Sequence, residues 1–338
     1  MAYFTGKKVL IIGGTGSIGR KLLDTILLDS PEVVRIFSRD EHKQFELQQE
    51  MREFTNIRYL IGDIRDYDRV YRAMHDIDYV FHVAAMKHVP SCEYNPFEAV
   101  QTNIIGTQNV IQASLNANVQ RTIFTSTDKA ISPTNTYGAS KLMAERLIAS
   151  AQNHTGPRQT VFAAVRFGNV MGSRGSVIPL FKKQILKNRE ITVTDLMMTR
   201  FMMTLKQASD LTIQAMKEAQ GGEIFVLKMP VLLLEDLCEV IIEHMTLRLG
   251  ISPSDIRMKE IGLRPGEKMF EELMTQEEAL NALELEHMFV IQNIFLGKNA
   301  TYEGAKPAGQ SSYSSNNVPV ITRNEVEQML LTNGLLEL

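Results

Sequence analysis

A glycine-rich turn near the N-terminus constrains the fold of this chain more than any other feature of the sequence. Residues 8–12 are rich in Val, Leu and Ile and predict a buried strand, and apolar residues recur at helical spacing from 18 to 28. The Gly-x-x-Gly-x-x-Gly between them lets the backbone approach a pyrophosphate, to which the helix N-terminus offers free N–H groups. The turn predicts a dinucleotide site, with a purely structural turn as the alternative. Its predicted contacts are Gly13, Thr15, Gly16, Ser17, Ile18 and Gly19.

Segments typical of strands and helices alternate from residue 7 to about residue 170. This alternation predicts an α/β fold with a Rossmann-like, doubly wound parallel sheet and a smaller C-terminal substrate-binding lobe. We expect residues 1–170 to form the cofactor-binding domain, with possible returns near 190–230, and residues 171–338 to form mainly the lobe and a C-terminal tail. Further strands are predicted at 33–37, 57–61, 78–83, 122–124 and 160–165.

The end of the second predicted strand bears on the choice of cofactor. In the NAD form of this fold an acidic side chain at that position binds the ribose 2′-hydroxyl. Here Ser38 and Arg39 come first, followed by Asp40 and by Lys43. A hydroxyl and two cations suit a 2′-phosphate, so the sequence favours NADP over NAD. The alternative is that Arg39 and Lys43 are only solvated.

Polar and small residues follow the next strands. Asp63 could accept from the adenine amino group or simply cap the following helix, and Ile64 stands beside it. Small residues at Ala84 and Ala85 would let the cofactor lie against the backbone. Lys87 would project over the carboxyl end of the sheet, where open parallel sheets bind ligands. The predicted cofactor contacts along these strand ends are Asp63, Ile64, Ala84, Ala85, Lys87 and Asn103.

A Tyr-x-x-x-Lys pair follows the fifth predicted strand. Tyr137 and Lys141 stand one helical turn apart, so they share one face of a helix. An ammonium beside a phenol favours the phenolate and produces a usable general base. Such a pair also arises by chance on solvated helices, but here it accompanies a dinucleotide turn. We therefore predict that Tyr137 and Lys141 contact the cofactor and take a proton from an alcohol.

The second half of the chain carries separated arginines in loop-like segments. Arg174, Arg200 and Arg264 each read alone as a surface residue. Guanidinium groups match phosphate oxygens in a bidentate manner. Together with a dinucleotide domain, the three arginines predict a substrate that carries a diphosphate.

Composition excludes several other classes of protein. The 338 residues carry a net charge of −3, which gives no basic field for nucleic acid. No apolar run is long enough to span a membrane, and two cysteines make no disulfide framework. We expect a cytoplasmic protein with no membrane partner and no metal site.

Taken in order, the motifs resemble those of the short, soluble UDP-N-acetylglucosamine 4,6-dehydratases, members of the extended short-chain dehydrogenase/reductases that act in surface-polysaccharide biosynthesis. The resemblance runs nearly end to end and is more specific than any single motif. Longer relatives carry transmembrane helices that this chain lacks, and many have Met where Tyr137 stands. The motifs are GGTGSIG, SRDEHKQFE, GDIRD, AAMKHVPSCEYNPFEAV, TNIIGTQNV, STDKA, YGASK, RFGNVMGSRGSVIP, MTRF and RPGEK.

The resemblance implies a reaction and a set of roles. The C4 hydroxyl of the sugar would lose its hydride to NADP and its proton to Tyr137, with Lys141 tuning the phenol and Thr127 binding O4. Asp128 would then act as acid at the C6 hydroxyl and Lys129 as base at C5. The opposite assignment stays open, and the alternative for this pair is an ordinary salt bridge.

The resemblance also implies substrate contacts and an outcome at C5. The Lys at 129 favours inversion of C5, and thus an L-arabino rather than a D-xylo 4-keto product. A homo-oligomer is expected as well. A nucleotide-sugar 4-epimerase or reductase, which shares the Tyr/Lys pair, and an NADPH-sensing module remain alternatives. The implied UDP-sugar contacts are Lys87, Asn169, Arg174, Val177, Thr199, Arg200, Arg264 and Glu267.

Overall fold

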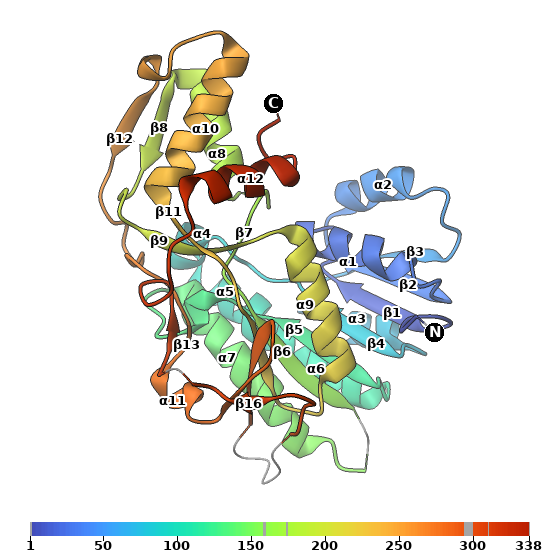
Figure 1. Ribbon diagram of the computed structural model, residues 1–338. Coiled ribbons are helices and arrows are strands. Elements are labelled where there is room, and N and C mark those ends of the chain that lie inside the picture. Colours follow the sequence, from blue (N-terminus) through green and yellow to red (C-terminus); the bar gives the residue numbers. More distant parts are fainter. Residues whose placement is uncertain (1, 158–159, 174, 294–299, 310, 338) are drawn as a thin grey trace.

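The computed structural model describes residues 2–157, 160–173, 175–293, 300–309 and 311–337. A large α/β body carries a smaller lobe on the side toward which the parallel strands end (Figure 1). Within these ranges, no helix combines the length and the apolar character that a membrane crossing requires.

The body is built on a sheet that contains ten strands in the described part of the chain, in the order β16-β14-β15-β10-β6-β5-β4-β1-β2-β3. The run from β3 to β10 is parallel. The strand order reverses beside β1, which is where doubly wound sheets open a crevice for a ligand. The predicted Rossmann-like fold is confirmed. The strands are β1 (Lys8–Ile12), β2 (Val33–Ser38), β3 (Ile57–Ile61), β4 (Tyr79–His82), β5 (Arg121–Thr125), β6 (Val161–Arg166), β10 (Ile224–Leu227), β14 (Ala282–Glu284), β15 (Met288–Ile291) and β16 (Lys306–Pro307).

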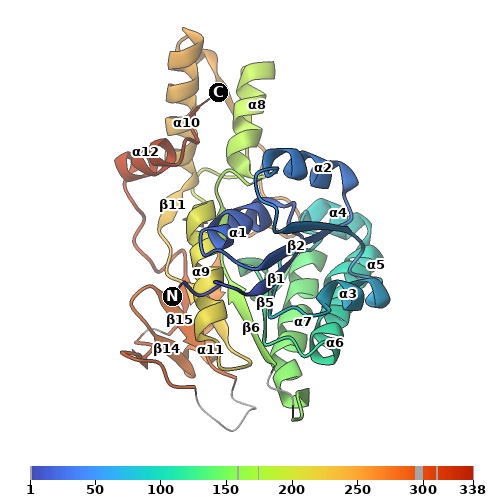
Figure 2. The same ribbon diagram turned by 90° about the vertical axis from the view of Figure 1, so that its right-hand side faces the viewer.

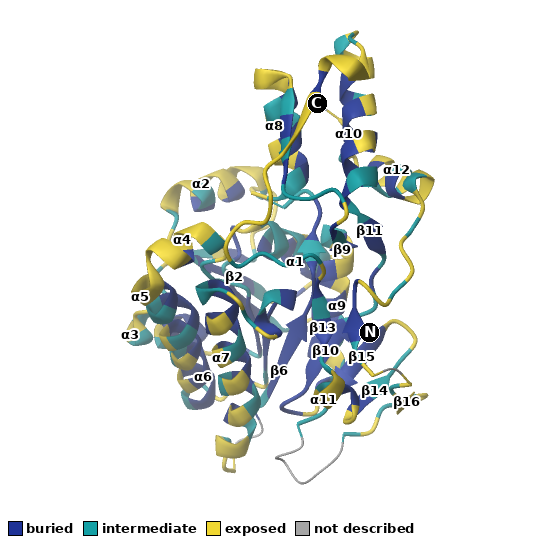
Figure 3. Ribbon diagram, turned by 90° about the vertical axis from the view of Figure 1, so that its left-hand side faces the viewer, coloured by how far each residue is buried: buried dark blue, intermediate teal, exposed yellow. Residues whose placement is uncertain are grey.

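Helices cover both faces of this sheet. In Figure 2, α1 and α9 lie on one face, and α3, α6 and α7 lie on the other. A strand buried on both faces has to be apolar at consecutive positions. In β1, the consecutive residues Leu10, Ile11 and Ile12 are all fully buried. Figure 3 shows the same pattern as buried strands beneath half-exposed helices. The helices of the body are α1 (Ser17–Leu27), α2 (Glu41–Glu50), α3 (Tyr67–Met74), α4 (Val89–Tyr94), α5 (Pro96–Ala99), α6 (Gly106–Asn116), α7 (Thr136–Ala151), α9 (Leu205–Glu218) and α11 (Gln276–Ala279).

The small lobe has its own apolar core, formed where α8, α10 and α12 pack on short strands. Phe181 and Ile185 of α8, Ile241 of α10 and Leu330 of α12 are all buried there. The strand β8 pairs with β12 in this lobe, and β7, β9 and β11 form a separate small sheet that leads into it. The elements are β7 (Asn169–Val170), α8 (Val177–Asn188), β8 (Glu190–Val193), β9 (Thr199–Met203), β11 (Val231–Leu233), α10 (Leu234–Leu249), β12 (Arg257–Glu260) and α12 (Arg323–Thr332).

Two details differ from the sequence-based expectations. Of the two possible returns to the body, β10 lies in the large sheet whereas β8 lies in the lobe. Residues 282–307 add the antiparallel strands β15, β14 and β16 to that sheet. A π-helical turn, Val100–Ile105, joins α5 to α6. Two short strands, β13 (Glu272–Met274) and β17 (Tyr313–Ser314), form a separate antiparallel pair.

Candidate active site

The glycine-rich turn forms a close-packed cradle at the mouth of the crevice. Gly13 has a φ of 89°, and a Cβ added there would lie 2.8 Å from Ala84 N. A Cβ at Gly19 would lie 2.6 Å from Gly13 O. No side chain larger than hydrogen fits at either position, so the turn brings bare backbone N–H groups to the site.

The crevice is one continuous cavity of about 870 Å³ between the body and the lobe. This volume falls in the usual range for small-molecule sites. The cavity brings together most of the residues that the sequence predicted from separate motifs. The predicted residues that line it are Gly13, Thr15, Gly16, Ser17, Ile18, Gly19, Ser38, Arg39, Asp40, Lys43, Ile64, Ala84, Ala85, Lys87, Thr127, Asp128, Lys129, Tyr137, Lys141, Asn169, Val177, Arg200, Arg264 and Glu267.

Three predicted contacts lie behind the lining, and one falls outside the described residues. Asp63 is held by Arg65, at 2.7 Å, rather than directed into the cavity, and it does not cap a helix because Asp66 caps α3. Asn103 bridges Met86 N, at 2.8 Å, and Ser140 Oγ, at 2.9 Å, so it fixes the loop after β4. Thr199 Oγ1 lies 2.9 Å from Ser315 Oγ. Arg174 is outside the described residues.

The cofactor half of the cavity has polar groups that fit a dinucleotide. Among the described residues, Thr102 Oγ1 and Ser126 Oγ are buried without a hydrogen-bond partner, and both residues line the cavity. A buried polar atom without a partner is costly, and a bound ligand would satisfy it. These two hydroxyls and the glycine cradle therefore fit the predicted dinucleotide.

A 3-10 turn after β5 presents Asp128 and Lys129 to the other half of the cavity. Lys129 Nζ lies 2.9 Å from Asp128 Oδ2, and Thr127 Oγ1 donates to Asp128 Oδ1 at 2.8 Å. The turn packs directly on the backbone of α7 at Gly138, where an added Cβ would lie only 2.0 Å from Lys129 O. Asn135 caps α7 by accepting from Gly138 N at 2.8 Å. The start of α7 and the turn are thus positioned as one unit.

Tyr137 and Lys141 lie on the buried face of α7, as the spacing predicted. Burial raises the pKa of Tyr137 to about 12, while Lys129 and the Thr127 hydroxyl act to lower it. Lys141 Nζ donates to Thr125 O at 2.6 Å, and burial lowers the pKa of Lys141 to about 7. Lys129 is thus a further cation that favours the phenolate of Tyr137, and the tuning role of Lys141 stays a prediction.

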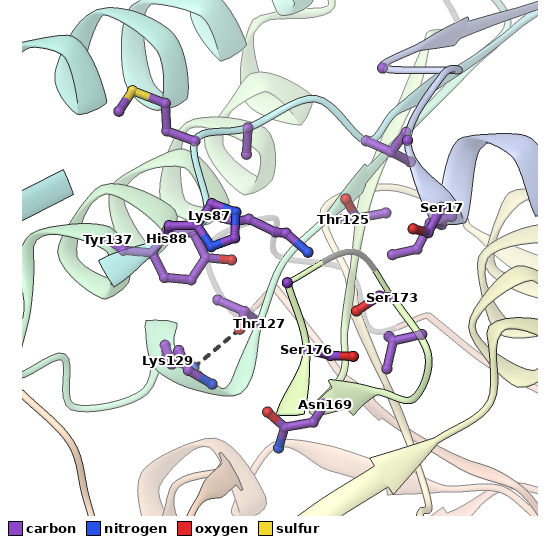
Figure 4. Close-up of a pocket in the computed structure, with 18 of the residues that line it drawn as sticks. Ser17, Lys87, His88, Thr125, Thr127, Lys129, Tyr137, Asn169, Ser173 and Ser176 are labelled. Atoms are coloured by element: carbon purple, nitrogen blue, oxygen red, sulfur yellow. Dashed lines mark hydrogen bonds between the residues drawn. The ribbon is translucent and has the colours of Figure 1, made fainter. Parts of the chain in front are cut away.

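Figure 4 shows Lys87, Thr127, Lys129 and Tyr137 arranged around one space, with Asn169 across from them. The tyrosine hydroxyl points toward this space from α7, and Lys129 approaches it from the 3-10 turn. A phenol, an ammonium and a carboxylate on adjacent walls provide two separate proton-transfer groups besides the tyrosine.

Sequence reasoning missed Glu271, which stands just before β13. Its carboxylate is buried beneath Lys129, with Oε1 at 3.6 Å from Nζ, and its Oε1 lies 3.4 Å from Arg200 Nε. Burial and the neighbouring Asp128 raise the pKa of Glu271 to about 7, although Lys129 and Arg200 oppose the shift. The signal available in the sequence was a carboxylate between apolar residues after the RPGEK motif, a pattern that fits an exposed strand end equally well.

Comparison with known protein families decides the classification. A family model described as polysaccharide biosynthesis protein matches residues 9–293. The chain belongs to the polysaccharide biosynthesis protein family. This family membership confirms the resemblance that the motifs carried.

Relatives within this polysaccharide biosynthesis family carry different names. An inverting UDP-N-acetylglucosamine 4,6-dehydratase of Campylobacter jejuni is 40% identical over 328 residues, 94% of each chain. A UDP-glucose 4-epimerase of Rickettsia massiliae is 40% identical over 342 residues, 97% of this chain and 96% of the relative. A Methanocaldococcus jannaschii protein named an uncharacterized membrane protein is 50% identical over 289 residues, 86% of each. The chain is thus an enzyme of the nucleotide-sugar dehydratase and epimerase superfamily.

A solved structure extends this similarity to the whole fold. The crystal structure of Pen from Bacillus thuringiensis has a TM-score of 0.92 and 59% identity, and the match covers 98% of this chain and 99% of that one. The body and the lobe both belong to this shared fold.

Proposed function

We propose that this enzyme removes water from UDP-N-acetylglucosamine across C5 and C6, which gives a 4-keto-6-deoxy sugar nucleotide with inverted configuration at C5. The observation that carries the proposal is the Asp128–Lys129 pair beside Tyr137 in one cavity. Oxidation at C4 alone needs one base. Elimination needs a second base at C5 and an acid at C6, and these two residues supply both.

The roles of the residues follow from their positions. Tyr137 takes the proton of the C4 hydroxyl, and Thr127, whose hydroxyl lies next to it, orients O4. A bound nicotinamide cofactor supplies the hydride chemistry at C4 and C6. The C4 ketone acidifies the C5 proton, which Lys129 removes, and Asp128, in its protonated form, acts as the acid at the departing C6 hydroxyl. Both residues line the cavity, and the Lys129 side chain, at 33% exposure, is the more accessible of the two.

Arginines at the lobe side suit the diphosphate of the substrate. Arg200 and Arg264 line the cavity together with Glu267 and Val177. Arg200 is held in place by backbone carbonyls, including Thr199 O at 2.8 Å and Met269 O at 3.1 Å. A fixed guanidinium binds phosphate oxygens at a smaller entropic cost than a mobile one. We propose that Arg200 and Arg264 bind the UDP moiety.

The cofactor proposed is NADP. Ser38, Arg39 and Lys43 line the cavity at the end of β2, and Asp40 is engaged as the cap of α2, where it accepts from Lys43 N at 3.0 Å. Gln44 Nε2 donates to Ser38 Oγ at 3.1 Å, so the Ser38 hydroxyl can donate its proton to a ligand. Lys43 is paired with Asp40, and Arg39 lies 3.4 Å from Asp63 and is 55% exposed. A carboxylate already engaged and an exposed guanidinium favour a 2′-phosphate over a 2′-hydroxyl.

Replacing Arg39 tests this choice. We expect Arg39→Ala to weaken NADP+ binding about 10-fold, the equivalent of about 1.4 kcal/mol, and to change NAD+ binding by less than about 2-fold. Titration calorimetry with each nucleotide measures both constants. The control is Arg58→Ala, since Arg58 donates to Thr55 O at 2.7 Å and lies outside the cavity. An equal loss for both nucleotides would argue against 2′-phosphate recognition by Arg39.

A 4-epimerase is the second candidate, because the rickettsial relative carries that name. An epimerase returns the hydride to C4 and has no use for an acid and base at C5 and C6. The two reactions are distinguished by treating the product with alkali, because a 4-keto-6-deoxy sugar then absorbs in the ultraviolet. We expect this absorbance from UDP-N-acetylglucosamine, and its absence together with formation of the C4 epimer would support the second candidate.

A further inference from the structure

Glu271 is a buried carboxylate that contacts the proposed base Lys129 and two other residues of the cavity wall, Asn169 and Arg200. Its carboxylate accepts from Asn169 Nδ2 at 2.9 and 2.8 Å and from Phe201 N at 3.2 Å. It also forms ion pairs with Lys129 and Arg200. Because Glu271 is not among the residues that line the cavity, whereas Asp128 and Lys129 are, it acts on the substrate through these neighbours and not by contact.

Lys129 cannot act as a base in the state that this cluster favours. Burial acts to lower the pKa of Lys129, but Asp128 and Glu271 together outweigh it and raise the pKa. An ammonium has three donors and no lone pair. Before Lys129 can remove a proton from carbon, its own proton must move to a neighbouring group.

The two carboxylates beside Lys129 differ in their capacity to take that proton. Burial acts to raise the pKa of Asp128, but Lys129 and the Thr127 hydroxyl outweigh it, so the pKa of Asp128 is lowered. The pKa of Glu271 is instead raised, and the charged groups that face this carboxylate are Asp128, Lys129 and Arg200. When the surroundings make the pKa values of two neighbouring carboxylates differ in this way, the carboxylate with the higher pKa is the proton acceptor.

We propose that Glu271 is a positioning residue that takes the Nζ proton of Lys129 before Lys129 acts at C5, and returns it after Lys129 has released the C5 proton to solvent. One N–H bond breaks and one O–H bond forms, so an ammonium and a carboxylate become an amine and a carboxylic acid. The separation of 3.6 Å is slightly longer than a hydrogen bond, and a small rotation of the Lys129 side chain closes it. This relay rests on the proposed dehydration and adds to it the source of the free amine.

The variant Glu271→Gln keeps the shape of the side chain and removes its capacity to take a proton. We expect its dehydration kcat to fall about 100-fold, while KM for UDP-N-acetylglucosamine changes by less than about 3-fold. Reduced nicotinamide should accumulate during turnover, because the step at C4 does not need Lys129 as a free amine. The matched control is Glu272→Gln, since the charges near Glu272 are Lys268, Glu278 and Arg166 and not the catalytic pair. It should behave as the wild type.

The pH profile separates a relay from a structural role. Below about pH 7 Glu271 is protonated and cannot accept, so the wild-type kcat should rise with pH through that value. Glu271→Gln should lose this rise, and Glu271→Asp should keep a rise at reduced kcat. A Gln variant with a wild-type profile at lower amplitude would overturn the relay. If the Gln variant does not fold, an Asp variant without the rise would overturn it too. Failure of the wild type to form any dehydrated product would instead reject the proposed function, and the relay with it.

Discussion

Lys129→Ala should bind NADP+ with wild-type affinity and form dehydrated product about 10²- to 10⁴-fold more slowly, the usual contribution of a general base. Lys129 Nζ lies 2.9 Å from Asp128 Oδ2 at the wall opposite the glycine cradle, so its loss leaves the cofactor contacts in place. Product formation is followed by the ultraviolet absorbance of the alkali-treated sugar, and cofactor affinity by calorimetry.

The matched variant for this experiment is Lys129→Arg. A guanidinium keeps the positive charge next to Asp128 and Glu271 but does not lose a proton in proteins. It should therefore be as inactive as Lys129→Ala while retaining more of the thermal stability. Full turnover by the Arg variant would show that only the charge at this position matters, and Lys129 would then have no role as base.

Arg166→Met should reduce the free energy of unfolding by about 3–5 kcal/mol, which is typical of a broken buried ion pair. Arg166 on β6 is fully buried at 0% exposure, and its guanidinium lies 2.7 Å from Glu145 Oε2 and 2.9 Å from Glu278 Oε2. It also donates to Leu273 O at 2.9 Å. Without it, two carboxylates remain in a region with little water. Urea unfolding followed by circular dichroism measures the loss.

A double variant tests the physical reason. Arg166→Met with Glu145→Leu removes the charge on both sides of the closest pair, and apolar replacement of a buried pair is often nearly neutral. The double variant should therefore be more stable than Arg166→Met alone. If it is less stable, the cost lies in lost packing and not in an uncompensated charge. Because Glu145 lies on α7, the pair also holds the helix that carries Tyr137 and Lys141.

The parallel part of the sheet was predictable because its signals are local. Each of its strands from β1 to β6 is a short apolar run that ends in a turn, and the glycine turn fixed the first unit. The strands β14 to β16 were not predictable in this way, since each has only two to four residues and is defined by its antiparallel partners. The segments of β14 and β16 carry no periodicity from which to assign a strand, and the apolar run of β15 is too short to be told from a buried turn of helix.

In the candidate site, too, residues in contiguous motifs were predictable and residues placed by long-range packing were not. Motifs contiguous in sequence, such as Gly13 to Gly19 and Thr127 to Lys129, line the cavity as expected. Glu271 was missed because its position depends on the packing of β13 against the 3-10 turn, a contact across more than a hundred residues. The orientation of Lys141 toward Thr125 O was missed for a related reason, since helical spacing gives the face of a helix but not the partner that faces it.

The most direct test of the account is proton NMR of the product formed from UDP-N-acetylglucosamine in D2O. We expect a 4-keto-6-deoxy sugar with deuterium at C5 and the couplings of the L-arabino configuration, because the proton that Lys129 removes from C5 is lost to solvent and a solvent-derived deuteron is added to the opposite face. UDP-N-acetylgalactosamine that retains its C6 hydroxyl and its C5 proton would contradict the account and identify the enzyme as an epimerase.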